Sequence, residues 1–139
     1  MAAVRIVESR TLPWMTQDGP RDDYGEPRMI EVAEPDGRGA ARYPHPGSDT
    51  ELYLHEAHIP PDTETKVHAH QTDEIIYVLG GEMHLGARVL GPGDSIFIPG
   101  MTLYGFHSGP DGLHFLNFRG RRDRSHITKE RLVADRGGA

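Results

Sequence analysis

The sequence of 139 residues contains no cysteine. Disulfides, thiolate metal ligands and cysteine nucleophiles are therefore excluded, and any metal has to be held by nitrogen and oxygen atoms. A long apolar run is also missing near the start of the chain, because Arg5 and Glu8 interrupt it. Neither a secretory signal nor a membrane span is expected there, and the cytoplasm is the simplest location.

Positive charge is scarce as well. The formal net charge is −6 and the isoelectric point is about 5.8, a balance that argues against nucleic acid or an anionic membrane as the main partner. The one basic run, residues 119–124, is interpreted as a solvated edge of the molecule. A small-molecule substrate or ligand is therefore the expected partner.

Glycine and proline, in contrast, are abundant. The 17 Gly and 11 Pro favour many short strands joined by tight turns over helices, and the length suits one domain. Prolines are dense in the first third of the chain, so residues 1–49 are predicted to form an arm that packs on the core or on a partner subunit. Its best strand candidate is residues 28–33.

Short runs of strand-forming residues begin after residue 50. They predict strands at residues 51–59, 74–79, 82–85, 88–90, 95–98, 103–107 and 113–119. Gly80 and Gly81 predict a hairpin turn, and residues 125–135 predict a short C-terminal helix. Strands at this spacing indicate an all-β fold, either a closed antiparallel barrel or a double sheet.

Residues 68–74 carry the most specific chemical pattern. On an extended strand His68 and His70 project from the same face, about 7 Å apart along the backbone. The three residues that follow are compatible with a turn, so Glu74 can return on the neighbouring strand as a third, anionic ligand. Two imidazoles and one carboxylate leave coordination positions free, which indicates an open, catalytic site for a divalent metal.

The spacing of His68, His70, Glu74 and Gly81 resembles the first motif of the cupin superfamily, in which two His and one Glu bind a divalent metal inside a small β-barrel. A second cupin-like motif runs over residues 93–100. The resemblance implies a cupin-like antiparallel β-barrel, also called a double-stranded β-helix or jelly roll, of the RmlC-like kind. It divides the chain into the arm, a core and a tail with a short helix, at residues 1–49, 50–119 and 120–139.

Tyr104 occupies the position where the resemblance leads us to expect a fourth metal ligand, a His. Tyr104 could ligate as a phenolate, which its ordinary pKa near 10 makes costly, or point into the cavity as a hydrogen-bond donor or general acid. The remaining interpretations are that Tyr104 only packs, or that His107 ligates instead. Strand parity places His107 on the opposite face, unless a bulge near Gly105 reverses the assignment.

The other histidines carry less information. Each of them is interpreted as an exposed or hydrogen-bonded side chain, and His55 is the one best placed to line a pocket: His55, His58, His84 and His114. The cavity walls are predicted from the apolar strand residues, namely Ile76, Val78, Phe97, Met101, Phe106, Phe115 and Phe118.

The resemblance implies enzymes of several kinds, including dioxygenases, isomerases, lyases and polyketide cyclases. We expect a small metal-dependent enzyme that acts on a carbonyl, enol or phenolic compound and uses one divalent transition metal, Fe, Zn, Mn or Ni. The alternative is a non-catalytic ligand-binding or sensor protein with a structural metal or none. The resemblance further implies a homodimer, across whose interface the arm could extend.

Overall fold

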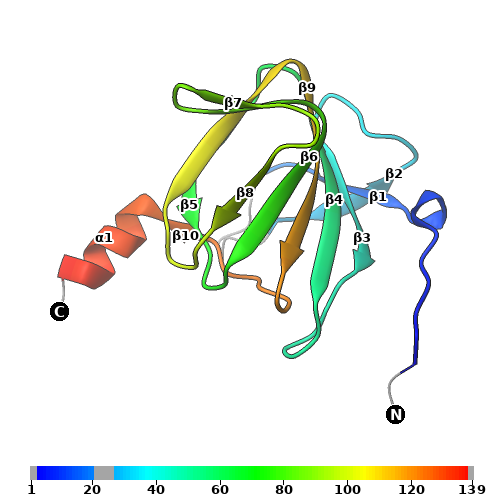
Figure 1. The fold of residues 1–139 in the computed structure, drawn as a ribbon, viewed down its shortest axis with the longest axis horizontal. Coiled ribbons are helices and arrows are strands. Elements are labelled where there is room, and N and C mark those ends of the chain that lie inside the picture. The colour runs from blue at the N-terminus through cyan, green and yellow to red at the C-terminus, as the bar shows by residue number, and fades with distance from the viewer. Residues whose placement is uncertain (1–2, 21–26, 138–139) are drawn as a thin grey trace.

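The structure, a computed structural model, describes residues 3–20 and 27–137 (Figure 1). These residues form an antiparallel, mostly β structure with one C-terminal helix, which confirms the predicted all-β class. In chain order the elements are a 3-10 turn (Ser9–Thr11), β1 (Trp14–Gln17), β2 (Met29–Val32), β3 (Ala40–His45), β4 (Tyr53–Ile59), β5 (Glu64–Ala69), β6 (Glu74–Leu85), β7 (Arg88–Leu90), β8 (Ser95–Ile98), β9 (Tyr104–Arg119), β10 (Ile127–Thr128) and α1 (Lys129–Gly137).

The two longest strands, β6 and β9, form the spine of the barrel. One edge of β9 pairs with β6, while its other edge pairs first with β5 and then with β4. The free edge of β6 is covered by β8 and β7 in the same way. Apolar side chains of β4, β6, β8 and β9 fill the interior between these strands, namely Ala57, Ile76, Val78, Met83, Ile98, Phe106, Leu113 and Phe115.

The predicted hairpin turn at Gly80 and Gly81 is wrong, because β6 continues through both residues to Leu85. The pairing of β6 with β9 shifts register on either side of Gly81, which has a φ of +68°. A Cβ atom at Gly81 would overlap the carbonyl oxygen of Gly112 on β9. Glycine is therefore required where two bulged strands approach each other closely, and the chain turns only at Gly86.

The N-terminal residues extend the main sheet beyond β4, in the order β4, β3, β1, β2. The prediction of residues 28–33 agrees with β2, but β1 and β3 were not predicted as strands. Pro44 lies inside β3, at a register shift between Arg42 and His45, where a missing N–H is tolerated. Trp14 on β1 packs edge-on against His58 of β4, with 5.1 Å between the ring centres.

The tail differs from the predicted helix at residues 125–135. Ile127 and Thr128 form β10, which pairs with β5, and the helix begins only at Lys129. Hydrogen bonds to a neighbouring strand override a weak local helical pattern here. The helix α1 projects from the barrel at the opposite side from the N-terminus (Figure 1). Among the described residues, no helix is long and apolar enough to cross a membrane.

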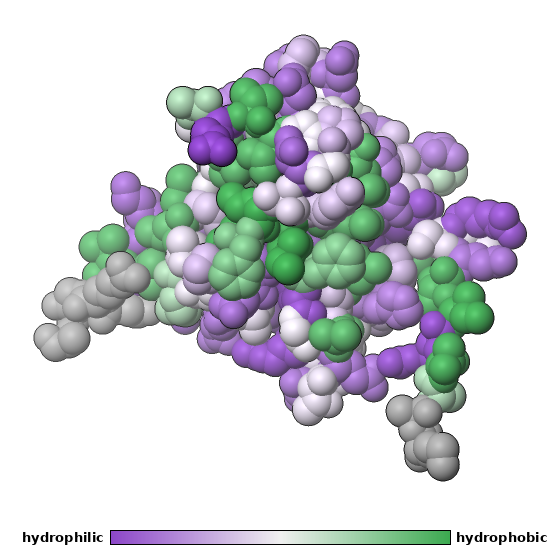
Figure 2. Space-filling view, viewed as in Figure 1, coloured by the Kyte–Doolittle hydropathy of each residue, from purple (hydrophilic) through white to green (hydrophobic). Residues whose placement is uncertain are grey.

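Two residues predicted as cavity walls, Phe97 and Phe118, lie on the outside instead, where they are 59% and 41% exposed. Phe118 follows the inward-facing Asn117 on β9, so strand alternation turns its ring outward. Figure 2 shows the resulting apolar surface at the centre of one face of the molecule.

Candidate metal centre

Two imidazoles face each other at one end of the barrel. His68 Nε2 and His70 Nε2 are 3.1 Å apart, while His68 Nδ1 lies 2.7 Å from the carbonyl oxygen of Lys66 and His70 Nδ1 lies 2.5 Å from that of Ser125. A carbonyl oxygen only accepts hydrogen bonds, so each neutral ring carries its hydrogen on Nδ1. Both Nε2 atoms then present lone pairs to one another, an arrangement that a shared cation relieves.

The spacing of this pair suits a metal ion. Two nitrogens bound to one ion at about 2.1 Å each are separated by about 3.0–3.4 Å, depending on the angle at the ion. Burial, and after it the positive charge of Arg119, lower the pKa of His70, so that its imidazole stays neutral. A neutral imidazole is the form that binds metal.

Glu74, the first residue of β6, supplies the anionic group. Its carboxylate is buried, and Oε2 accepts a hydrogen bond from Asn117 Nδ2 at 2.8 Å and lies 3.2 Å from a guanidinium nitrogen of Arg119. Oε1 is buried as well, and none of the described side chains donates a hydrogen bond to it. A buried carboxylate oxygen without a partner is costly, and it fits a site built for a cation.

The geometry corrects one detail of the prediction: Glu74 does not return on the strand next to His68. The strand β5 pairs with β9 and β10, whereas β6 pairs with β7, β8 and β9. In the part of the chain that the structure describes, a different group, Glu56, His58 and His114, has all its ligand atoms within 4.8 Å of one another.

Arg119 lies close to both Glu74 and His70, and the sequence interpretation missed it. The basic run at residues 119–124 was assigned to a solvated edge, but the Arg119 side chain is only 8% exposed. It donates hydrogen bonds to Asn117 Oδ1 and to the carbonyl oxygen of Asp123, both at 3.0 Å, and one of its nitrogens lies 3.5 Å from His70 Nε2. Arg119 follows Asn117 by two residues, so both side chains project from the same face of the strand. This spacing was the sequence signal that could have placed Arg119 inside the barrel.

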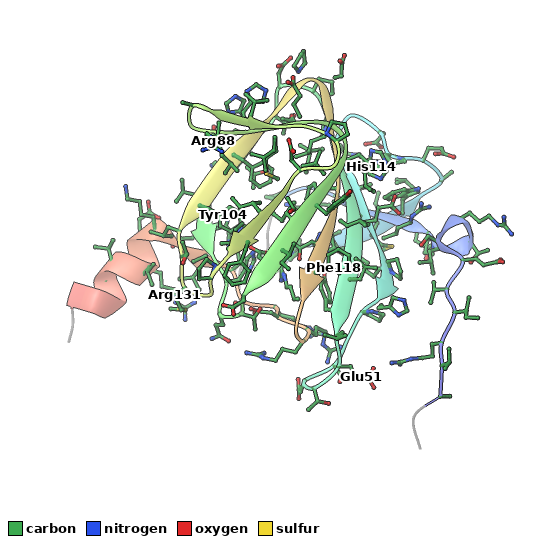
Figure 3. All side chains as sticks on the ribbon, viewed as in Figure 1. Glu51, Arg88, Tyr104, His114, Phe118 and Arg131 are labelled. Atoms are coloured by element: carbon green, nitrogen blue, oxygen red, sulfur yellow. The ribbon has the colours of Figure 1, made fainter. Side chains whose placement is uncertain are left out.

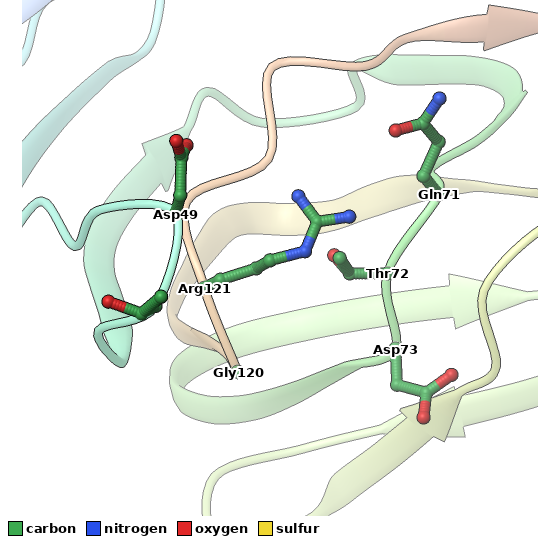
Figure 4. A pocket seen from close by; sticks show the side chains of 7 residues that line it. Asp49, Gln71, Thr72, Asp73, Gly120 and Arg121 are labelled. Carbon is green, nitrogen blue, oxygen red and sulfur yellow. The ribbon is translucent and has the colours of Figure 1, made fainter.

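Arg121, in contrast, lies outside the barrel. Together with Asp49, Gln71, Thr72 and Asp73 it lines a shallow hollow of about 430 Å³ (Figure 4). This part of the run agrees with a surface position.

Tyr104 begins β9 and lies opposite His68 in the strand register, with 4.8 Å between the two ring centres. Figure 3 shows where it lies in the barrel. Burial, and after it the negative charge of Glu74, raise the pKa of Tyr104 well above its ordinary value of 10.0, so its phenol is neutral in the protein. His107 lies on the exposed face of β9, where it stacks on His84. The structure thus brings Tyr104 to the imidazole pair and leaves His107 outside.

Two further histidines surround the pair. The ring of His126, from the tail, stacks on His68 with ring centres 4.7 Å apart. His126 lies outside the cupin-like region, so the sequence did not indicate that it belongs to the site. His55 accepts or donates a hydrogen bond of 2.6 Å between its Nδ1 and the Tyr53 hydroxyl. Burial, and then the charge of Arg119, lower the pKa of His55 to about 3, which keeps it neutral.

A hollow of about 1180 Å³ opens onto His70. Its wall combines aromatic rings with polar side chains, among them Tyr43, Tyr53, Met101, Ser125 and His126. This volume and mixture of side chains suit a small organic molecule. Such a molecule would contact His70 directly.

Comparisons with known proteins agree with this architecture. The family model described as a cupin domain matches residues 55–116. No curated protein matches the chain. Among solved structures, the polyketide cyclase RemF from Streptomyces resistomycificus is 23% identical, with 91% of this chain and 86% of that chain covered and a TM-score of 0.62.

Two RmlC-like cupin structures are also similar. The protein from Shewanella frigidimarina is 27% identical over 64% of this chain and 82% of its own, with a TM-score of 0.53. The protein from Ralstonia eutropha is 16% identical over 96% of this chain and 84% of its own, with a TM-score of 0.62. Residues 55–116 therefore match a cupin domain, and the antiparallel barrel has the fold of these cupin structures.

Proposed function

We propose that this cupin is a metal-dependent enzyme that acts on a small carbonyl, enol or phenolic compound, by chemistry of the isomerase, lyase or cyclase type. The observation that carries the proposal is the pair of Nε2 lone pairs of His68 and His70, fixed 3.1 Å apart by two backbone carbonyls. His68, His70 and Glu74 would hold one divalent transition metal. Bound there, the ion would act as a Lewis acid toward a substrate oxygen.

The residues around the pair have complementary tasks. Tyr104 donates a hydrogen bond or a proton to the substrate oxygen on which negative charge develops. Arg119 keeps a fixed positive charge beside Glu74 and favours an anionic form of the substrate. The rings of Tyr43 and Tyr53 at the mouth offer apolar faces to an aromatic or conjugated substrate.

Similar proteins support this choice of substrate class. One protein with a similar fold is a polyketide cyclase. Carbonyl and phenolic groups are compatible with the donors that face the cavity here, and we extend that substrate class to this chain as part of the proposal.

A non-catalytic ligand-binding cupin is the second candidate, and one observation favours it. Arg119 already compensates the charge of Glu74, so a ligand could be held by Arg119 and the histidines without a metal. Metal content separates the two candidates. We expect His68→Ala to lower the metal content of gently purified protein by about one equivalent relative to the parent, whereas His107→Ala on the outer face leaves the metal content unchanged.

Hydrogen exchange tests the chemistry without knowledge of the product. A panel of 1,3-dicarbonyl and phenolic ketone compounds is incubated with protein in deuterated water, and deuterium uptake next to the carbonyl is followed by NMR. We expect Tyr104→Phe to lower the rate about 100-fold or more, in the range of a lost general acid, while metal content stays unchanged. Equal rates for the parent and Tyr104→Phe would contradict the role of the hydroxyl, and exchange no faster than without protein would favour the non-catalytic candidate.

A further inference from the structure

A second group of metal-ligating side chains lies on the outer side of the sheet. His58 on β4 and His114 on β9 are directly paired in the strand register, and their rings stack with centres 3.9 Å apart and planes at 11°. Glu56 precedes His58 by two residues, so it projects from the same face of β4. All ligand atoms of the three residues lie within 4.8 Å of one another.

Neighbouring side chains hold this group in place. Arg42 Nε donates a hydrogen bond of 2.6 Å to Glu56 Oε1, which leaves Oε2 directed at His114 Nε2, also at 2.6 Å. The guanidinium of Arg42 lies over Trp14, whose ring edge packs against His58. Metal-bound carboxylates are usually fixed by such an outer hydrogen bond, and here Arg42 provides it.

The group also has access to solvent. His58 and His114 line a hollow of about 570 Å³ on the barrel surface, together with Gly112 of β9 (Figure 3 labels His114). Two nitrogens and one oxygen from the protein, with an open side toward solvent, form the donor set that zinc and similar borderline ions prefer. The stacked rings direct their lone pairs along nearly parallel planes, so one imidazole has to rotate out of the stack for both nitrogens to bind one tetrahedral ion.

We propose that Glu56, His58 and His114 form a second binding site, for a divalent transition metal such as zinc, on the outside of the barrel. An ion seated between Glu56 Oε2 and His114 Nε2 takes the place of the hydrogen that now joins them. It links β4 to β9 and contacts the hollow through its remaining position. The site shares no residue with His68, His70 and Glu74, so it is independent of the proposed function.

Trp14 provides a direct readout, because it is the only tryptophan in the sequence and its ring contacts His58. Paramagnetic Co²⁺ bound at the outer site, formed by Glu56, His58 and His114, should quench Trp14 fluorescence. The titration uses the full chain with His68→Ala and His70→Ala, which removes the inner imidazoles. We expect saturable quenching with one equivalent of Co²⁺, and reversal of this quenching by Zn²⁺.

Variants assign the quenching to the three ligands. In the same background, His114→Ala and Glu56→Gln should each weaken Co²⁺ binding at least 10-fold. His107→Ala is the matched control, because it removes another stacked cross-strand histidine of β9, paired with His84, and should leave binding unchanged. Circular dichroism checks that each variant is folded, and Glu56→Gln preserves the shape of the side chain if His114→Ala does not fold.

Two results would overturn the proposal. One is quenching that rises with Co²⁺ without saturation. The other is a titration of the folded His114→Ala or Glu56→Gln protein that coincides with that of its background. Because the inner imidazoles are absent throughout, a failure of the proposed function would leave these results unaffected.

Discussion

Arg119 places a positive charge beside the Glu74 carboxylate in the inner site, the group formed by His68, His70 and Glu74. Without it, the buried Glu74 carboxylate would lose its positively charged partner and keep the hydrogen bond from Asn117 Nδ2. We expect Arg119→Met to lower the free energy of unfolding in the presence of a chelator by about 3–5 kcal/mol, the usual cost of breaking a buried ion pair from one side. Urea unfolding followed by circular dichroism measures this loss.

Zinc should restore part of that stability, because a cation held by His68, His70 and Glu74 compensates the carboxylate in place of Arg119. We expect zinc to raise the free energy of unfolding more in Arg119→Met than in the parent. Arg122→Met, which changes an exposed residue of the same run, is the control. If zinc stabilised the parent and Arg119→Met equally, Arg119 and the metal would not be substitutes for one another.

Asp123 controls the loop that fixes the tautomer of His70. Its carboxylate accepts hydrogen bonds from Thr72 N, Thr72 Oγ1 and Ser125 N, and the Ser125 carbonyl in turn accepts from His70 Nδ1. Although burial acts to raise it, these hydrogen bonds hold the pKa of Asp123 well below its ordinary value of 3.8. The stabilisation by Asp123 is therefore complete above about pH 4 and is lost as the pH falls through the folded-state pKa.

We expect Asp123→Asn to be less stable than the parent at pH 7 by about 1–3 kcal/mol, the range for hydrogen bonds to a charged group. Below pH 4 this difference should shrink, because Asp123 of the unfolded parent takes up a proton that the folded protein does not bind. Urea unfolding at a series of pH values measures both quantities, with Asp111→Asn on the surface as the control. A difference that stayed constant down to pH 2 would be inconsistent with this explanation.

At the scale of the elements, alternation along strands was the most informative signal in the sequence. It placed Tyr104, Phe106 and Ser108 on one face of β9 and His107 on the other, as the structure does. Local signals failed where a distant segment decides the conformation. Gly81 lies within a strand because of Gly112, and the start of the predicted helix became β10 because of β5.

For the inner site, too, local sequence signals were informative and contacts between distant segments were not predicted. The spacing of the His68 motif could be recognised because it is local. Arg119 reaches Glu74 from the other end of the core, and the outer pair of His58 and His114 depends on the register between β4 and β9. The spacing of residues within one segment does not predict contacts between segments that are distant in the sequence.

The bend of β6 and β9 gives a prediction with a close control. Gly81 and Gly86 both have positive φ, but a Cβ atom would overlap Gly112 at Gly81 and would contact nothing within 4 Å at Gly86. We expect Gly86→Ala to cost about 1–2 kcal/mol, the backbone strain alone, and Gly81→Ala to cost clearly more. Thermal unfolding compares them, and equal losses would mean that the two strands can separate at the bend.

At the scale of the whole molecule, the N-terminal residues are built into the sheet. The strand β3 covers the edge of β4, and Trp14 covers His58. A protein that begins at residue 46 would expose this edge and the face beneath Trp14, so we expect it to aggregate. Light scattering and circular dichroism test this, and a monodisperse, natively folded truncated protein would show that the arm is dispensable.

The same light-scattering measurement on the full chain tests the homodimer that the sequence resemblance implies. Deleting the arm cannot serve for that purpose, because the deletion removes three strands of the sheet as well as any contact with a partner. The exposed apolar surface of Phe97 and Phe118 is a better place for a substitution. A change to lysine there alters the outside of the barrel without shortening the chain.

The strand β9 supplies parts of both proposed sites, since it carries Tyr104, Asn117 and Arg119 inside the barrel and His114 outside. The carbonyl of Ser125, which fixes the His70 tautomer, follows it in the chain. A ribosome therefore makes His68 and His70 long before the groups that turn them into a site. A metal at the proposed inner site would accordingly be selected only after β9 and the residues that follow it have joined the fold.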